Sequence, residues 1–234
     1  EDRRGARRSF PLGPGFWLEG RPIEALPPRP APASTQGWAT ASGRRVTNSG
    51  SFAPESSGPK VAKRSRIWVE GRHDADLIQH VWGEDLAEAG IAVQLLDGVD
   101  NLEDILEVFA PTERARAGVL VDHMVPRSKE SRIAEAVSGR WPGAVLILGH
   151  PFVDIWQAVK PERLGVRAWP QIPRGVDIKH GTLAALGWPH ADQRDIAIGW
   201  KRILSTVRTY RDLEPALLGR VEELIDFVTV PWAQ

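Results

Sequence analysis

The chain has no cysteine among its 234 residues, and its only methionine is Met124. Without cysteine it can form neither a disulfide framework nor a thiolate-ligated zinc or iron–sulfur site, and this composition suits the cytoplasm. No apolar run approaches the roughly 20 residues that a membrane helix needs, so we expect no membrane partner. Because the chain begins at Glu1 and its methionine is internal, we expect the numbering to begin inside a longer protein.

The chain also lacks a net charge, since 30 basic residues balance 30 acidic ones. No global field therefore attracts it to nucleic acid, and any such binding must come from local basic clusters. One such cluster extends from Arg127 to Arg132.

Composition divides the chain into four regions. Residues 1–26 contain short apolar groups broken by glycine and proline, which predicts a partial N-terminal β segment. Residues 27–60 are rich in proline, serine and glycine, which predicts a flexible linker with little contact to the core. Residues 61–170 form the expected α/β domain, and residues 171–234 a C-terminal helical region.

Strand and helix patterns alternate in the α/β domain. Apolar runs predict strands at 67–69, 91–96, 118–121, 144–148 and 166–169, with helices between them, among them a short one at 152–159. This order indicates a mostly parallel sheet of four to five strands, with helices on both faces. Two amphipathic helices follow, at 192–207 and 214–228, as a C-terminal helical pair. They either cover a sheet face or form the surface of a homodimer.

Two predicted strands end in acids, Glu70 and Asp122. Open parallel sheets bind ligands at the carboxyl ends of their strands, so both acids are expected to face one crevice and could hold a divalent cation. Asp74 follows in the next turn, where helix capping explains it equally well. His123 is a ligand, a general acid or base, or an ordinary hydrogen-bonded histidine.

Other candidates lie after the third and fourth strands. His150 and Asp154 follow the fourth strand and either face the same crevice or form a turn and a helix cap. After the third strand, Ser128, Lys129 and Arg132 fit a phosphate-binding loop. The alternative for this segment is a capped, solvated helix terminus.

The sequence from Val69 to Asp74, paired with that from Val121 to Met124, resembles the topoisomerase–primase (Toprim) family. The closest analogues in layout are small Toprim proteins such as the 5S ribosomal RNA maturase, and the likeness covers residues 65–159. The resemblance implies a four-stranded parallel sheet, magnesium, and the cutting or joining of nucleic-acid phosphodiesters. Only Glu70, Asp74 and Asp122 match the motif.

The chain departs from this motif at Met124, which stands in place of a second aspartate and is a poor ligand for a hard cation. Glu70, Asp122 and Asp154 together would still offer three carboxylates. With His123 or His150 added, the site would suit Mn²⁺ better than Mg²⁺.

The chain as a whole resembles an actinobacterial family defined by a domain of unknown function, DUF3097. The likeness rests on the segments at residues 10–16, 68–74, 120–123, 128–132 and 149–161. It implies no activity.

The favoured hypothesis is metal-dependent phosphodiester chemistry on RNA or DNA, by a nuclease or a phosphotransferase. Glu70, Asp122 and His123 would be catalytic. Phosphate would be bound by Arg72, Ser128, Lys129 and Arg132. The alternative, favoured by Met124, is a non-catalytic module that binds nucleic acid, a nucleotide or a protein partner in the same crevice.

Overall fold

The computed structural model describes residues 13–18, 20–25, 38–40, 43–53, 62–96, 98–124 and 128–230. The chain forms two compact units, residues 1–35 and residues 36–234. The first holds an antiparallel pair of strands, β1 (Gly13–Leu18) and β2 (Arg21–Ala25). Its side chains are largely exposed, as for Trp17 at 70%. The expected small N-terminal β segment is confirmed.

The second unit is built on a four-stranded parallel sheet in the order β6-β5-β7-β8. Its strands are β5 (Arg66–Val69), β6 (Ala92–Leu95), β7 (Ala117–Val121) and β8 (Val145–Gly149). All five residues of β7 are buried, as expected for a strand covered on both faces. The α/β class and the parallel sheet are therefore confirmed.

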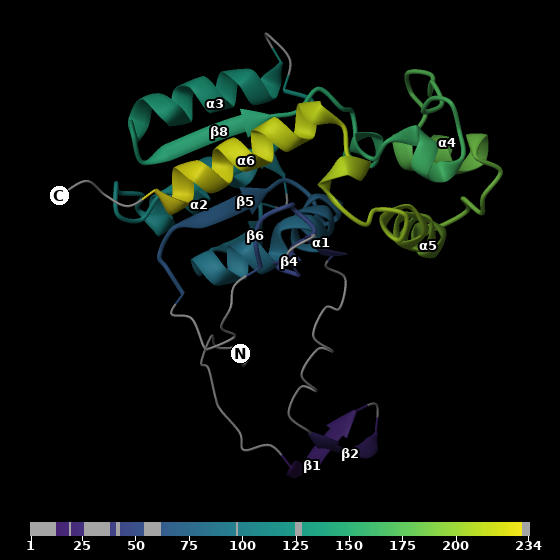
Figure 1. The fold of residues 1–234 in the computed structure, drawn as a ribbon, viewed down its shortest axis with the longest axis horizontal. Coiled ribbons are helices and arrows are strands. Elements are labelled where there is room, and N and C mark those ends of the chain that lie inside the picture. The colour runs from purple at the N-terminus through teal and green to yellow at the C-terminus, as the bar shows by residue number, and fades with distance from the viewer. Residues whose placement is uncertain are drawn as a thin grey trace. The chain divides into compact units, whose positions relative to one another are not determined.

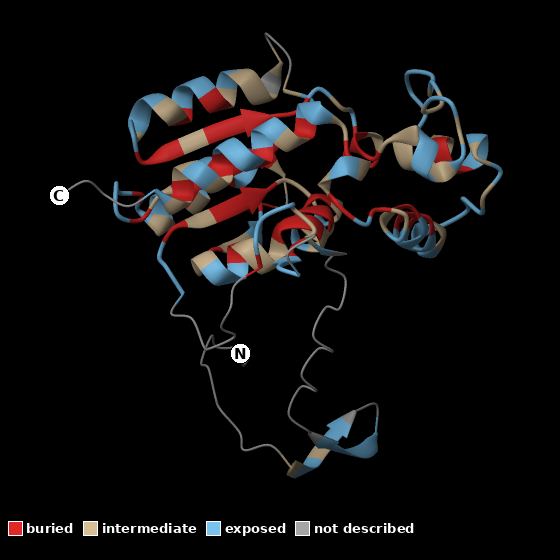
Figure 2. Cartoon of the chain, in the orientation of Figure 1, coloured by how far each residue is buried: buried red, intermediate tan, exposed pale blue. Residues whose placement is uncertain are grey.

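Helices cover both faces of this sheet, also as expected (Figure 1). Helices α1 (Arg72–Ala89) and α6 (Pro215–Thr229) pack on one face, and α2 (Leu102–Phe109) and α3 (Lys129–Arg140) on the other. The strands alternate accordingly, with Ile67 and Leu120 in the first layer and Trp68 and Val119 in the second. Figure 2 shows the buried strands between partly exposed helices.

For α6, the structure decides between the two expected positions, on a sheet face or at a dimer surface. The apolar stripe of α6 is buried within the unit, through Leu217, Val221, Leu224 and Val228. This stripe therefore covers a sheet face and is not left free as a dimer surface. Helix α5 (Gln193–Leu204) lies with α4 (Ile178–Ala185) beyond the arrowheads of β5 and β8 (Figure 1). The sequence patterns did not predict α4.

Two expected elements differ in the structure. Residues 166–169 form no fifth strand. Arg167 interrupts this short apolar run, and the indole of Trp169 packs on the core and donates to the carbonyl of Val159 at 2.8 Å. The helix expected at 152–159 is only a short 3-10 helix, η2 (Ile155–Ala158), because the chain stays irregular from residue 151 to its cap at Asp154. The other 3-10 helices are η1 (Val99–Asn101), η3 (Pro161–Leu164) and η4 (Tyr210–Asp212).

The expected linker, residues 27–60, is partly attached to the α/β unit. Strands β3 (Trp38–Ala39) and β4 (Arg45–Val46) pair, and residues 43–53 contact α1. Val46 is 6% exposed, and the amide of Asn48 donates to the carbonyl of His80 at 3.0 Å. The prediction of little contact with the core is wrong for this part, because buried Val46 and Ala53 and the polar contacts of Arg45 and Asn48 anchor it. The remainder of the linker lies outside the described residues.

In the described part of the chain, no helix is both long and apolar enough to span a membrane.

Candidate metal centre

The carboxyl ends of three neighbouring strands carry the candidate residues. Glu70 follows β5, Asp122 follows β7 and His150 follows β8, and these strands are adjacent and parallel. The carboxylate of Glu70 accepts a hydrogen bond from the backbone N–H of Asp122 at 3.1 Å, which fixes the turn after β7. The three residues therefore share one edge of the sheet, as expected.

Asp74, Asp122 and His150 converge at this edge. Nε2 of His150 lies 3.0 Å from Oδ1 of Asp122 and 3.8 Å from Oδ1 of Asp74, and the three residues offer ligand atoms within 4.8 Å of one another. These contacts are ion pairs when His150 is protonated, and none of the three atoms has a hydrogen bond among the described residues. Buried polar atoms without hydrogen bonds are costly, and a shared cation would also satisfy all three. The donor set therefore fits a divalent metal.

Burial and mutual charge shift the pKa values of this cluster. Burial raises the pKa of Asp74 to about 7, and the nearby carboxylate of Asp122 adds to the increase. Burial lowers the pKa of His150, but the carboxylates of Asp122 and Asp74 outweigh it and raise that pKa to about 9. Burial also raises the pKa of Glu70. Without a cation the cluster retains protons that a bound metal would displace.

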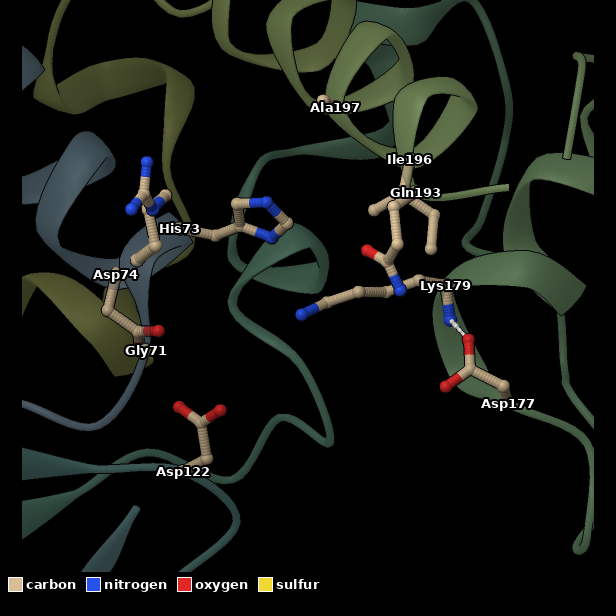
Figure 3. Close-up of a pocket in the computed structure, with 10 residues that line it drawn as sticks. Gly71, His73, Asp74, Asp122, Asp177, Lys179, Gln193, Ile196 and Ala197 are labelled. Atoms are coloured by element: carbon tan, nitrogen blue, oxygen red, sulfur yellow. Dashed lines mark hydrogen bonds between the residues drawn. The ribbon is translucent and has the colours of Figure 1, made fainter. Parts of the chain in front are cut away.

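A pocket of about 460 Å³ opens beside the cluster (Figure 3). Asp74 and Asp122 line it on the side of the sheet, together with Gly71, Arg72 and His73. The opposite wall comes from α4, α5 and the residue before α4, through Asp177, Lys179, Gln193, Ile196 and Ala197. Two cations, Arg72 and Lys179, therefore line the same pocket as two of the candidate metal ligands.

His73 is held in this pocket by two tryptophans. The indole N–H of Trp156 donates to Nδ1 of His73 at 3.0 Å. The imidazole ring lies 5.6 Å from the ring of Trp156 and 5.0 Å from that of Trp200, centroid to centroid. Burial, and secondly the charge of Lys179, lowers the pKa of His73 to about 4. The ring is therefore neutral at physiological pH.

Family models match most of the chain. The model described as DUF3097, C-terminal domain, matches residues 65–230, and that described as DUF3097, N-terminal domain, matches residues 1–28. The chain belongs to the DUF3097 family. A search of curated proteins found no match.

Two solved structures are similar to this DUF3097 chain at low identity. One is the C-terminal region of the OLD protein of Burkholderia pseudomallei, with 14% identity and a TM-score of 0.43, covering 72% of this chain and 99% of that one. The other is the C-terminal region of the OLD protein of Xanthomonas campestris pv. campestris, with 14% identity and a TM-score of 0.39, covering 71% and 96%.

Asp154, expected as a metal ligand, lies outside the three-residue cluster of this DUF3097 chain. One carboxylate oxygen accepts the backbone N–H of Trp156 at 3.0 Å, and the other lies 3.1 Å from Nζ of Lys179. Burial raises the pKa of Asp154, while Lys179 opposes the increase. Asp154 therefore caps η2, the second of the two roles considered from the sequence. Its other oxygen forms an ion pair with Lys179, which lines the pocket.

His123, expected to be catalytic, also lies outside the cluster. It is exposed, its backbone is left-handed with φ at 43°, and its N–H donates to the carbonyl of Phe152 at 3.1 Å. After this turn, Met124 lies against Gly149, where an added Cβ would lie 2.0 Å from the Cβ of Met124. Met124 lines a second pocket, of about 500 Å³, with Gly149, Pro151 and residues of α6. Asp122 and Met124 thus belong to different pockets.

The expected phosphate-binding loop is a capped helix terminus where the structure describes it. The hydroxyl of Ser128 accepts the N–H of Ser131 at 3.1 Å, and the guanidinium of Arg132 donates to the carbonyl of Ser128 at 3.4 Å. Neither Ser128 nor Arg132 lines the pocket of Figure 3. Arg127 and the side chain of Lys129 lie outside the described part. Among the expected phosphate ligands whose side chains the structure describes, only Arg72 lines the pocket.

Sequence reasoning missed Lys179 and Gln193 as pocket residues. Both belong to the C-terminal helical region, more than 50 residues after Asp122 and more than 100 after Glu70. No local pattern marks them. The packing of α5 through Ile196 and Trp200 onto the core brings this wall to the sheet edge.

Proposed function

We propose that the chain is a metal-dependent enzyme that cleaves phosphodiester bonds of RNA or DNA. The proposal rests on one observation: buried ligand atoms of Asp74, Asp122 and His150, without hydrogen bonds among the described residues, converge beside a pocket that two cations line. The carboxylates can hold a metal, and the cations can bind an anionic ligand such as a phosphate group beside that metal.

The donor set favours Mn²⁺ over Mg²⁺ as the resident ion. Mg²⁺ prefers oxygen ligands and retains several waters, whereas an imidazole ligand suits transition metals. A bound divalent ion supplies charge neutralisation at a phosphate oxygen and lowers the pKa of a coordinated water.

The chain's own residues perform the remaining work. Arg72 and Lys179 bind phosphate oxygens from the two sides of the pocket, and the ion pair with Asp154 orients Lys179 before substrate arrives. Glu70 holds the turn that carries Asp122. Glu70 does not line the pocket, so we propose that it acts by positioning Asp122. Since the chain has no net charge, these local cations supply the attraction for nucleic acid.

The test is cleavage of 5′-labelled single-stranded RNA and DNA in the presence of Mn²⁺, Mg²⁺ or EDTA. We expect cleavage with Mn²⁺, weaker cleavage with Mg²⁺ and none with EDTA. Asp122→Asn should reduce the rate by about 100-fold or more, because the ligand loses its charge. The matched control is Asp104→Asn on α2, an exposed aspartate outside the pocket. Equal rates for Asp122→Asn and the parent would refute the assignment.

A second candidate is a non-catalytic module that binds the same ligands in the same pocket. The observation in its favour is Met124. It stands at the sequence position of the second aspartate of the Toprim motif, and its thioether lines a separate pocket. Metal-dependent binding of the labelled oligonucleotides without any cleavage would support this candidate over the enzyme.

A further inference from the structure

His73 packs against Trp156 and Trp200, and of these three residues it alone lines the pocket. The rings of Trp156 and Trp200 stack at 6.1 Å with an angle of 7°, and both residues are buried, at 1% and 3% exposed. His73 contacts both rings and lines the pocket. The two indoles are therefore not available to stack on a base, and they instead fix the orientation of the imidazole.

The hydrogen bond from Trp156 also fixes the tautomer of His73. An indole nitrogen can only donate, so Nδ1 of His73 must accept and carries no proton. The proton of the neutral ring is then on Nε2. No described residue accepts from Nε2, and this atom is not one of the chain's buried unpaired atoms. This N–H group is therefore without a partner among the described residues, on a side chain that lines the pocket.

We propose that His73 donates a hydrogen bond from Nε2 to an anionic phosphate oxygen in this pocket. Arg72 and Lys179 supply charge, whereas His73 supplies direction, because two ring contacts and one hydrogen bond set its N–H before the ligand binds. The proposal rests on the proposed function only in taking the oxyanion to be phosphate.

The first test is the tautomer. The full chain is prepared with ¹⁵N-labelled histidine, and the signal of His73 among the six histidines is identified by its loss in His73→Asn. At pH 7.5 we expect Nδ1 to have the shift of an unprotonated nitrogen and Nε2 that of an N–H. A His73 ring protonated at Nδ1 would overturn the proposal.

The second test is the affinity for orthophosphate, measured by titration in EDTA so that no metal contributes. His73→Asn keeps a side-chain oxygen that can accept from Trp156 but loses the Nε2 donor. We expect it to weaken binding about tenfold, as for a hydrogen bond to a charged group, with its thermal stability close to that of the parent. Addition of orthophosphate to the parent should shift the Nε2 signal of His73.

Trp156→Phe provides the matched control for the tautomer. It keeps an aromatic ring against His73 but removes the indole donor, so both tautomers should be populated and affinity should fall only about twofold. Unchanged orthophosphate affinity in His73→Asn, or no binding by the parent, would overturn the role of His73. If the tautomer and affinity results hold while the parent cleaves no oligonucleotide, the proposed enzymatic function fails alone.

Discussion

The two walls of the pocket are built differently. The sheet-edge wall presents two acids, Asp74 at 3% exposed and the half-buried Asp122, and the imidazole of His150, at 0% exposed, lies against both. The wall formed by α4 and α5 presents a cation, with the side chain of Lys179 at 32% exposed, and an exposed glutamine, Gln193. A metal requires donors held at fixed separations, which strand ends in a packed core provide. A phosphate ligand tolerates longer, more mobile cations, which a helical wall provides.

The largest expected effect is loss of metal affinity when a buried ligand on the sheet edge is removed. His150→Ala should weaken Mn²⁺ binding about 100-fold, because one of three ligands is lost. Titration calorimetry is the measurement. The matched variant is His123→Asn, since His123 is an exposed histidine on the same edge and asparagine tolerates its left-handed backbone. An equal loss of Mn²⁺ affinity in both variants would contradict the assignment of His150, rather than His123, as a metal ligand.

The sequence predicted the sheet edge better than the helical wall, for a physical reason. Glu70, Asp122 and His150 each follow a short buried apolar run, and parallel strands bring their carboxyl ends together. The choice of ligands was harder to predict, because side-chain direction decides it. Asp74 turns into the core from the first turn of α1, while Asp154 is engaged by Trp156 and Lys179.

The helical wall depends on tertiary contacts that leave no local pattern. Helix α4 has only eight residues, so it gives a weak periodic signal. The linker segment shows the same limit, because Asn48 attaches it to α1 by a hydrogen bond that composition does not reveal. The four strands of the sheet and the amphipathic helix α5 were therefore predictable, whereas α4 and the attachment of the linker segment were not.

A smaller effect is expected on the helical wall. Lys179→Met should weaken oligonucleotide binding about tenfold and reduce its salt dependence by about one phosphate contact. Lys201→Met, an exposed lysine of α5 that does not line the pocket, is the control and should change neither. Because Lys179→Met leaves the buried carboxylate of Asp154 without its cation, the double variant with Asp154→Asn should regain stability but not affinity. Regained affinity would show that Lys179 acts only through Asp154.

The smallest effect concerns the pH dependence of the sheet edge. The pKa of Asp74 is raised from 3.8 to about 7, and that of His150 from 6.5 to about 9. The folded state therefore binds protons more tightly than the unfolded state. Stability from Asp74 is lost as pH rises towards 7, and stability from His150, complete below 6.5, is lost as pH rises through 9.

In EDTA, the melting temperature should consequently fall by about 3 °C or more between pH 6 and pH 8. With Mn²⁺ the trend should reverse, because protons compete with the metal and affinity rises with pH. Differential scanning calorimetry measures both series. Parallel slopes with and without Mn²⁺ would show that protons and metal do not share these ligands.

The turn at His123 also determines which changes could give the protein a further acidic ligand. Its left-handed backbone sends Asp122 to one pocket and Met124 to the other, and the absence of a side chain at Gly149 lets Met124 lie close to β8. A Met124→Asp substitution would place its carboxylate beside Pro151 and α6, away from the three-residue cluster. A change at this codon alone would therefore add no acid to the cluster of Asp74, Asp122 and His150. An acidic ligand from this position would also require a different backbone turn at His123.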